Sequence, residues 1–381
     1  MFGATGFTGS LTAEYLARNA PAQTSWALAG RSTSKLNAAR DRLAAIEPAC
    51  GNLELLQADV TDEASVRAVA ESARVVITTV GPYVHYGEPL VAACAAAGTD
   101  YVDLTGEPEF VDLMWLRHHE AAQRSGARIV HSCGFDSIPH DLGALFTVDQ
   151  LPDGVPIEVE GFVRAGGTFS GGTYHSAVNA FARIRQASRV AGQRREREGK
   201  PAGRQVKARR GSIHSDSALG AWAVPFPSID PQVVTRSAAA LERYGPDFTY
   251  SHYLALKHLP MVAGLAGGVG TLMALSQLPP TRKLLLKLKD PGDGPTPEQR
   301  EKGWFKVRFH GQGGGTRVVT EVSGGDPGYG ETAKMLAESA LCLAHDDLPE
   351  SAGQVTPAVA MGDALTKRLQ QAGIGFAVLE A

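Results

Sequence analysis

The stretch that decides the fold stands at the start of the chain, Gly3-Ala4-Thr5-Gly6-Phe7-Thr8-Gly9, and leads into a helix-like run at Ser10–Asn19. Glycines at this spacing let a turn be tight, let the backbone approach a pyrophosphate, and let the helix pack on a sheet. The N–H groups at the start of such a helix bind anions. The motif therefore predicts a dinucleotide-binding loop, whose members are Gly3, Thr5, Gly6, Phe7, Thr8 and Gly9.

Working outward from this loop, short β-rich runs alternate with helix-like runs to about residue 140. The β-rich runs are Trp26–Ala29, Leu53–Gln57, Val75–Val80, Tyr101–Leu104 and Arg128–His131. The helix-like runs are Ser10–Asn19, Ser34–Ile46, Ala64–Ser72, Pro89–Gly98 and Val111–Ser125. Such alternation is typical of a parallel sheet covered by helices on both faces. We predict an α/β protein with a Rossmann-type doubly wound parallel sheet.

A second domain is expected because 381 residues exceed what one core of about 250–300 residues accommodates. Strand-like pieces occur at Ile157–Ala165, Lys306–Gly311 and Thr316–Ser323, and Gly311–Gly315 is a candidate hairpin loop. Helix-like runs at Thr332–Ala344 and Pro357–Ala372 would lead back to the first domain. The expected organisation is an NADP-binding Rossmann domain over 1–145, a second α+β domain for substrate and dimerisation over 146–345, and a C-terminal return over 346–381.

The first strand is unusually short in this sequence. Only Met1 and Phe2 precede Gly3, whereas a central parallel strand averages roughly five residues. We therefore expect the natural chain to begin upstream of Met1.

The residues after the second strand, Ala29-Gly30-Arg31-Ser32, indicate which dinucleotide binds. An NAD enzyme places an acidic residue here for the ribose 2′-hydroxyl, whereas Arg31 and Ser32 suit a 2′-phosphate. We therefore predict NADP(H). Asp59, after the third strand, can accept a hydrogen bond from the adenine amino group, although a place near a helix N-cap explains it equally well. Ligands lie off the carboxyl ends of such strands, so the cofactor-binding set also includes Val80, Gly81 and Pro82.

Four motifs together resemble the saccharopine-dehydrogenase-like oxidoreductases, and within them the actinobacterial trans-acting enoyl reductases. They are Gly3–Gly9, Thr79–Tyr83, Tyr101–Glu107 and Cys133–Gly143. The resemblance runs over nearly the whole chain and implies an NADPH-dependent reduction of a C=C bond in a lipid or polyketide intermediate. It also places the Cys133–Gly143 loop beside the nicotinamide.

Enoyl reduction needs a donor on the carbonyl oxygen and a proton for the α-carbon. The candidate catalytic residues are Tyr83, His85 and Asp136, and helix N–H groups after Cys133–Gly143 would stabilise the oxyanion. Helix capping explains Asp136 equally well. Two other functions stay open: a saccharopine-type amino-acid dehydrogenase, and a non-catalytic NADP-binding protein serving as a membrane-bound scaffold or redox sensor.

Bulk composition excludes several partners. The net charge of −3 gives no reason to expect nucleic acid. Four scattered cysteines form no C-x-x-C pair, which predicts reduced thiols and no metal site. The chain opens without a signal-peptide pattern, so we expect a cytoplasmic protein.

Two stretches stand out by composition. Leu259–Thr281 has no charged residue and is followed by the basic Arg282–Lys289, while Arg183–Arg210 is strongly basic. Glycines and prolines make Leu259–Thr281 a poor spanning helix, so we expect a peripheral contact with the inner face of the plasma membrane, through which a lipid-like substrate is reached. A buried core helix or a homodimer interface is the equally weighted alternative.

Overall fold

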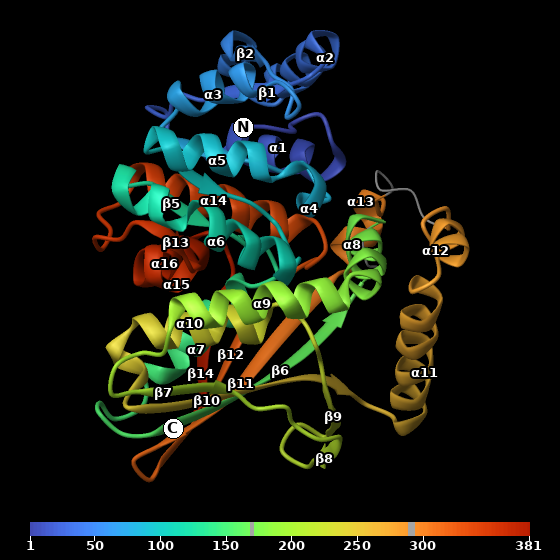
Figure 1. Cartoon of the computed structure of the whole chain (residues 1–381), viewed down its shortest axis with the longest axis vertical. Coiled ribbons are helices and arrows are strands. Elements are labelled where there is room, and N and C mark those ends of the chain that lie inside the picture. Colours follow the sequence, from blue (N-terminus) through green and yellow to red (C-terminus); the bar gives the residue numbers. More distant parts are fainter. Residues whose placement is uncertain (168–170, 289–293) are drawn as a thin grey trace.

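Two β-sheets organise the chain, and Figure 1 shows them one above the other with helices packed around each. The computed structural model describes residues 1–167, 171–288 and 294–381. One continuous hydrophobic core joins the two parts. In this core Leu16 and Val130 of the first part share their surroundings with Phe309 and Val322 of the second.

The first sheet is parallel, and Phe2 lies at its centre. A single bridge joins Phe2 to Ala29 on one side and another joins it to Thr78 on the other. In spatial order the sheet contains β2 (Glu54–Gln57), β1 (Ala27–Gly30), Phe2, β3 (Val75–Ile77), β4 (Asp100–Val102), β5 (Arg128–Val130) and β13 (Gly353–Val355). Apart from the added β13, this is the Rossmann strand order. The predicted doubly wound sheet is confirmed.

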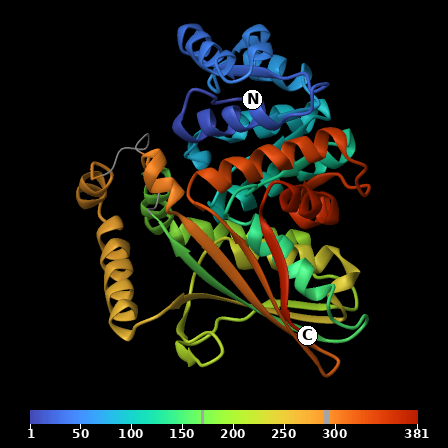
Figure 2. The ribbon, with the colours of Figure 1, turned by 180° about the vertical axis from the view of Figure 1, so that it is seen from behind.

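Helices cover both faces of this sheet. One face carries α1 (Phe7–Asn19), α2 (Thr33–Ala44) and α14 (Gly330–His345), and the other carries α3 (Glu63–Glu71), α5 (Glu88–Ala97) and α6 (Pro108–Ser125). Figure 2 shows α14 lying alongside α1 across the back of the molecule. The helix starts follow local chemistry: the Asp62 carboxylate, for example, accepts hydrogen bonds from the N–H groups of Ala64 and Ser65 and caps α3.

The second sheet is mixed and larger. Its order is β14 (Gly375–Glu380), β12 (Thr316–Gly324), β11 (Trp304–Gly313), β6 (Ile157–Gly166), β10 (Asp247–Leu256), β9 (Ala221–Pro225) and β8 (His214–Asp216), with β7 (Gln205–Ala208) also beside β10. The β11–β12 hairpin turns at Gly314 and Gly315, which have φ of +58° and +85°. Only glycine adopts two such consecutive conformations readily, which fixes the register of the hairpin.

The remaining helices pack on this sheet or outside it. α7 (Ile138–Val148) and α10 (Asp230–Ala240) lie on its covered face, and α9 (Ile184–Glu198) lies against α6. The others are α4 (Tyr83–Tyr86), α8 (Gly171–Ala182), α11 (Leu259–Ser276), α12 (Pro279–Leu285), α13 (Pro297–Glu301), α15 (Pro357–Ala360) and α16 (Gly362–Gln371). The view in Figure 1 places α11 at the outer edge of the molecule, where it packs against α8 and meets β9 and β10.

The chain crosses between the two parts at places other than residues 145 and 345. α14 already packs on the first part, against α1 and β3, because nearly all of its residues from Thr332 to Leu343 are buried there. β13 extends the first sheet through β5, whereas β14 pairs with β12 in the second. The C-terminal segment therefore contributes to both sheets.

Several side chains of the basic stretch Arg183–Arg210 form ion pairs or hydrogen bonds within the protein. Arg183 pairs with Glu109 of α6, and the buried Arg194 pairs with Asp112. Arg204 donates to the carbonyl oxygens of Ala238 and Leu241 at the end of α10. These contacts hold α9 and the following segment to α6 and α10, so this stretch serves the fold.

A buried carboxyl joins α7, α10 and α15. Asp141 accepts a hydrogen bond from the Ser237 hydroxyl at 2.5 Å and another from the Ala358 N–H at 2.8 Å. Burial nevertheless raises the pKa of Asp141 to about 7. Because the folded state binds this proton more tightly than the unfolded chain, its stabilising effect is complete below the unfolded pKa near 3.8 and is lost as the pH rises through about 7.

We therefore predict that Asp141→Asn removes a pH-dependent loss of stability. An amide fills the same space and can satisfy both Ser237 and Ala358 without ionising. Between pH 4 and 8 the free energy of unfolding of the variant should rise relative to the wild type by up to about 4 kcal/mol, the value of the shift at 1.36 kcal/mol per pH unit. Urea unfolding across this range measures it. Parallel stability curves for the two proteins would contradict the prediction.

Candidate active site

The glycine loop closes so tightly that side chains are excluded from it. Gly3 has a φ of +87°, and a Cβ on Gly9 would lie 2.1 Å from the Gly3 carbonyl oxygen. The Thr79 hydroxyl donates to that same oxygen at 3.2 Å. Gly6 is the N-cap of α1, so the first N–H groups of this helix, which have no partner within the helix, face outward beside the loop.

The open side of the loop fits a dinucleotide. Thr5 and Gly6 are exposed, and a Cβ on Gly6 would meet only the Gly3 carbonyl oxygen, at 3.5 Å. Backbone N–H groups and a helix N-terminus with this much free space suit a pyrophosphate. Phe7 closes the far side, where its ring meets Tyr329 edge-on at 4.8 Å.

Arg31 lies where the ribose of such a dinucleotide would reach. Its side chain is exposed and forms no ion pair with any residue that the structure describes. Ser32 is the N-cap of α2, and its hydroxyl accepts from the Lys35 N–H at 3.4 Å. Asp59 accepts from both the N–H and the hydroxyl of Thr61 at 2.9 Å, which lowers the pKa of Asp59. Asp59 therefore stabilises the turn before α3, while Asp62 is the N-cap of that helix.

The fourth strand end leads into Val80-Gly81-Pro82, which lies partly exposed at the carboxyl edge of the sheet. The next residue, Tyr83, is buried. Its hydroxyl donates to the Thr78 carbonyl oxygen and accepts from the Leu104 N–H, both at 3.2 Å. Burial and the Asp103 charge raise the pKa of Tyr83 well above its usual value. This hydroxyl therefore ties two strand ends together and is not free to donate to a substrate. His85 is exposed on α4 beside Tyr86.

Glu107, absent from the predicted site, fixes the loop that carries Tyr83. Its carboxylate accepts from the N–H groups of Tyr83 at 3.1 Å and Val84 at 2.9 Å, and from the Ser176 hydroxyl at 3.3 Å. It therefore caps α4 and joins α8 to the strand ends. Burial raises the pKa of Glu107. Glu107 is the last residue of the Tyr101–Glu107 motif, so this motif is the sequence feature that could have identified it.

Asp103 holds the neighbouring strand ends in place. One oxygen lies 2.7 Å from His131 Nδ1 and 2.9 Å from the Tyr101 hydroxyl, while the other accepts from the N–H groups of Thr105 and Ser132. Ser132 has a φ of +63°, an uncommon conformation for a residue other than glycine. The network therefore sets the start of the Cys133–Gly143 loop.

Asp136 lies on this loop, after β5 and close to Gly106 in the loop after β4. It is only partly buried, and its carboxyl group has no hydrogen-bond or ion-pair partner in the described part of the chain. A Cβ on Gly106, in the loop after β4, would lie 3.1 Å from Asp136 Oδ2. Glycine at this position therefore leaves room for the Asp136 carboxyl group. Burial, and then the Asp230 charge, raise the pKa of Asp136.

The start of α7 does not supply the oxyanion donors expected from the sequence. The Ser137 N–H donates to the Ser132 carbonyl oxygen at 2.8 Å, and the Ile138 N–H to that of Gly134 at 2.9 Å. Pro139 has no N–H, and the His140 N–H donates to Ser137. The loop folds back on the helix and uses these donors itself, so that expectation is wrong. Cys133 is buried with a raised thiol pKa, as expected of a packing residue.

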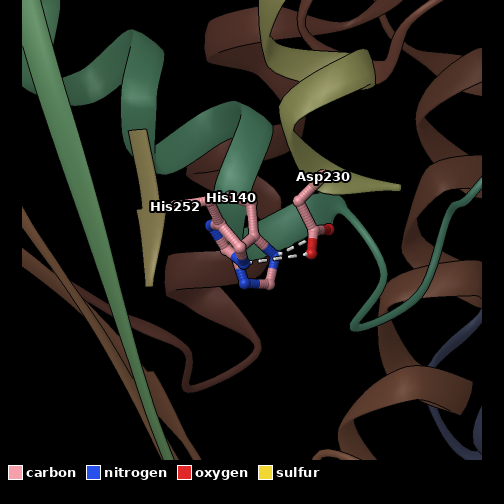
Figure 3. A group of neighbouring side chains, drawn as sticks. All are labelled: His140, Asp230 and His252. Carbon is pink, nitrogen blue, oxygen red and sulfur yellow. Dashed lines mark ion pairs between the residues drawn. The ribbon is translucent and has the colours of Figure 1, made fainter. Parts of the chain in front are cut away.

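Three buried polar side chains lie behind this loop: His140 of α7, Asp230 of α10 and His252 of β10 (Figure 3). His140 belongs to the Cys133–Gly143 motif, but no sequence signal points to the other two. Asp230 and His252 reach the loop only because α10 and β10 pack under α7.

Comparison with known proteins identifies relatives of the whole chain. The family described as the saccharopine dehydrogenase NADP binding domain matches residues 1–130. A Mycobacterium tuberculosis protein, provisionally named a trans-acting enoyl reductase, is 39% identical over 99% of this chain and 96% of its own. A trans-acting enoyl reductase of Mycobacterium ulcerans is 36% identical over 98% and 96%, and a saccharopine dehydrogenase-like oxidoreductase of Bos taurus is 32% identical over 100% and 97%.

A solved structure matches the fold. Saccharopine dehydrogenase (L-Glu forming) from Saccharomyces cerevisiae superposes with a TM-score of 0.55 at 14% identity, over 99% of this chain and 98% of its own. These matches confirm the resemblance found in the sequence. The cofactor is NADP(H), and the glycine loop described above has the space and donors to hold it.

We predict that Arg31→Ala separates the two nicotinamide cofactors. Hydrogen bonds to a charged group contribute roughly 1.5–3 kcal/mol, so NADPH binding should weaken about 10- to 150-fold while NADH binding stays nearly unchanged. Fluorescence titration with each cofactor measures the two constants. Arg42→Ala on α2, where Arg42 pairs with Glu14, is the matched control and should leave both unchanged. Equal losses for NADPH and NADH would show that Arg31 does not contact the 2′-phosphate.

Proposed function

The chain belongs to the saccharopine dehydrogenase-like oxidoreductases that include the trans-acting enoyl reductases, and from this premise we propose that it reduces the C=C bond of a lipid or polyketide intermediate with NADPH. The observation that carries the proposal is the position of Asp136. Its unpartnered carboxyl group stands on the loop after β5, next to Gly106 after β4, at the edge of the sheet where ligands of this fold bind.

The chemistry divides between the cofactor and the chain. Bound NADPH supplies the hydride that the β-carbon of the enoyl group accepts. The chain must then provide a proton for the α-carbon, so that hydride and proton together saturate the double bond. Asp136 suits this role because burial raises the pKa of its carboxyl group to about 7, so that a large share of these groups carries a proton at neutral pH. Burial raises the pKa of Asp136 more than the charge of Asp230 does, so the raised pKa does not depend on Asp230 alone.

Other residues of the site orient the parts. Glu107 anchors the loop after β3, and the Asp103 network anchors the loop after β5. Both carboxylates accept hydrogen bonds from backbone N–H groups, which holds these loops in place. Tyr83 contributes through the same strand ends, since its hydroxyl joins Thr78 to Leu104.

Turnover assays test this function. Purified protein should oxidise NADPH in the presence of an α,β-unsaturated thioester and not in the presence of keto or imino compounds. Asp136→Asn should lower kcat about 10²- to 10⁴-fold, the usual contribution of a general acid, with the Kd for NADPH unchanged. Asp347→Asn makes the same chemical change at an exposed surface position and should leave kcat unchanged.

The alternatives give different results. Turnover of an imino compound would identify an amino-acid dehydrogenase, and NADPH binding without turnover of any substrate would identify a non-catalytic binding protein. Full activity of Asp136→Asn would remove Asp136 from the reaction.

We also propose that the protein lies in the cytoplasm and reaches a lipid-like substrate by docking on the inner face of the plasma membrane through α11. This helix has a mean hydropathy of 1.6, and only 12% of it is buried. Large apolar side chains remain in solvent along α11 and the segment after it: Leu259, Met261, Met273, Leu275, Leu278, Leu284 and Leu288. Shallow insertion beside anionic headgroups would cover them.

The flanking charge supports this orientation. Lys257 precedes α11, and Arg282, Lys283 and Lys287 follow it, none of them in an ion pair in the described part of the chain. Lys289, which the sequence placed in the same basic flank, lies outside the described residues. A basic segment next to an apolar one is the arrangement that anionic lipid surfaces attract.

Liposome flotation tests the docking. The wild type should float with anionic vesicles and detach at high salt, whereas the double variant Lys283→Glu, Lys287→Glu should remain in the lower fraction. Each basic residue near the surface contributes about 1 kcal/mol, so two charge reversals should reduce binding more than about 30-fold. Failure of the wild type to float would contradict membrane docking. A dimer in analytical ultracentrifugation that dissociates on Leu275→Glu would then assign α11 to a homodimer interface.

A further inference from the structure

His140, Asp230 and His252 form a cluster whose unsatisfied atoms converge in the interior (Figure 3). His140 Nδ1 lies 3.2 Å from Asp230 Oδ1, and His252 Nε2 lies 3.5 Å from Asp230 Oδ2. The three side chains are at most 2% exposed. They come from α7, α10 and β10, so the cluster joins the helix after the candidate active-site loop to the second sheet.

These atoms are close together but poorly aligned for hydrogen bonds to one another. Despite the 3.2 Å separation, neither His140 Nδ1 nor Asp230 Oδ1 has a hydrogen-bond partner among the described residues, and the same holds for His140 Nε2 and His252 Nε2. Buried polar atoms are normally paired, so four orphans in one place require an explanation. Nitrogen and oxygen atoms whose lone pairs point at one shared position lie close together without being aligned for hydrogen bonds to one another.

The charge at the cluster is also unbalanced. Asp230 is buried, and no lysine or arginine that the structure describes pairs with it. The Ser228 hydroxyl donates a hydrogen bond to Oδ2 at 2.5 Å. A buried carboxylate without a cation is costly, and two imidazoles with one carboxylate provide the negative charge and lone pairs that a metal ion accepts.

The second nitrogen of His252 is already held in place. Nδ1 lies 3.1 Å from the Tyr250 hydroxyl, which is itself fully buried. When Nδ1 carries the proton and donates to that oxygen, Nε2 keeps its lone pair for a ligand. Histidines that bind metal are commonly held in this way through the nitrogen that does not bind.

From these observations we propose that His140, Asp230 and His252 bind one divalent transition-metal ion, most naturally Zn²⁺. Nitrogen and carboxylate ligands suit zinc and related ions, whereas Mg²⁺ prefers oxygen ligands alone. Three protein ligands leave one position of a tetrahedral ion for water. The sequence did not indicate this site. Its ligands are not cysteines, and they lie 90 and 22 residues apart in the chain, so they meet only when it folds.

Metal analysis of the purified full-length protein tests the proposal. After growth in medium containing zinc, the wild type should hold about one Zn²⁺ per chain by mass spectrometry, and the chelator-stripped protein should take up one Zn²⁺ and no Mg²⁺ in calorimetric titration. His252→Ala and Asp230→Asn should lose more than about 100-fold in affinity. Tyr250→Phe leaves all three ligands and should weaken binding about 10- to 100-fold, as the loss of a partner that orients a ligand does.

The controls separate binding from folding. His258→Ala removes an exposed histidine near the end of β10 and should bind zinc like the wild type. Circular dichroism of each stripped variant checks that it is folded, and the wild-type measurement requires no substitution. A stripped, folded wild type that takes up no zinc would overturn the proposal, as would His252→Ala binding zinc as tightly as the wild type.

Discussion

The close approach of Gly9 to the carbonyl oxygen of Gly3 is the constraint on which the structure depends. At 2.1 Å from that oxygen there is no room for a Cβ, so the chain can turn from the central strand into α1 only with glycine at this position. The turn places the N-terminus of α1 at the carboxyl edge of the parallel sheet. Every other part of the candidate site is positioned relative to that edge.

The same edge explains why buried carboxylates recur in this molecule. Where a strand ends, the following backbone N–H groups have no partner on a neighbouring strand. Asp103 and Glu107 accept hydrogen bonds from such groups in the loops after β3, β4 and β5. Both side chains are therefore committed to holding loops. Asp136 differs from them because its carboxyl group has no partner among the described residues, which leaves it available for chemistry.

The sequence predicted the first sheet well because its signals are local. A glycine motif and alternating runs locate the strands, although the third predicted run, Val75–Val80, ends as a strand at Ile77, where the chain turns toward Gly81 and Pro82. The helix expected over Pro357–Ala372 is divided at Gly362, whose φ is +38°. Long-range features could not be predicted: β14 pairs with β12, and His140 meets Asp230 and His252 only through the packing of α7 on α10 and β10. From the sequence we also expected free N–H groups at the start of α7, but in the structure these groups donate to carbonyl oxygens of the preceding loop.

In the proposed reaction NADPH delivers a hydride to the β-carbon of one C=C bond, and Asp136 delivers a proton to its α-carbon. Reduction with NADPH that carries deuterium at both C4 positions of the nicotinamide tests this most directly, because the label is then transferred whichever face of the ring donates the hydride. The account predicts a saturated thioester that carries one deuterium, located on the β-carbon by mass spectrometry, with the α-carbon taking its hydrogen from solvent. A saturated product without deuterium from the cofactor, or with the label on the α-carbon, would contradict it.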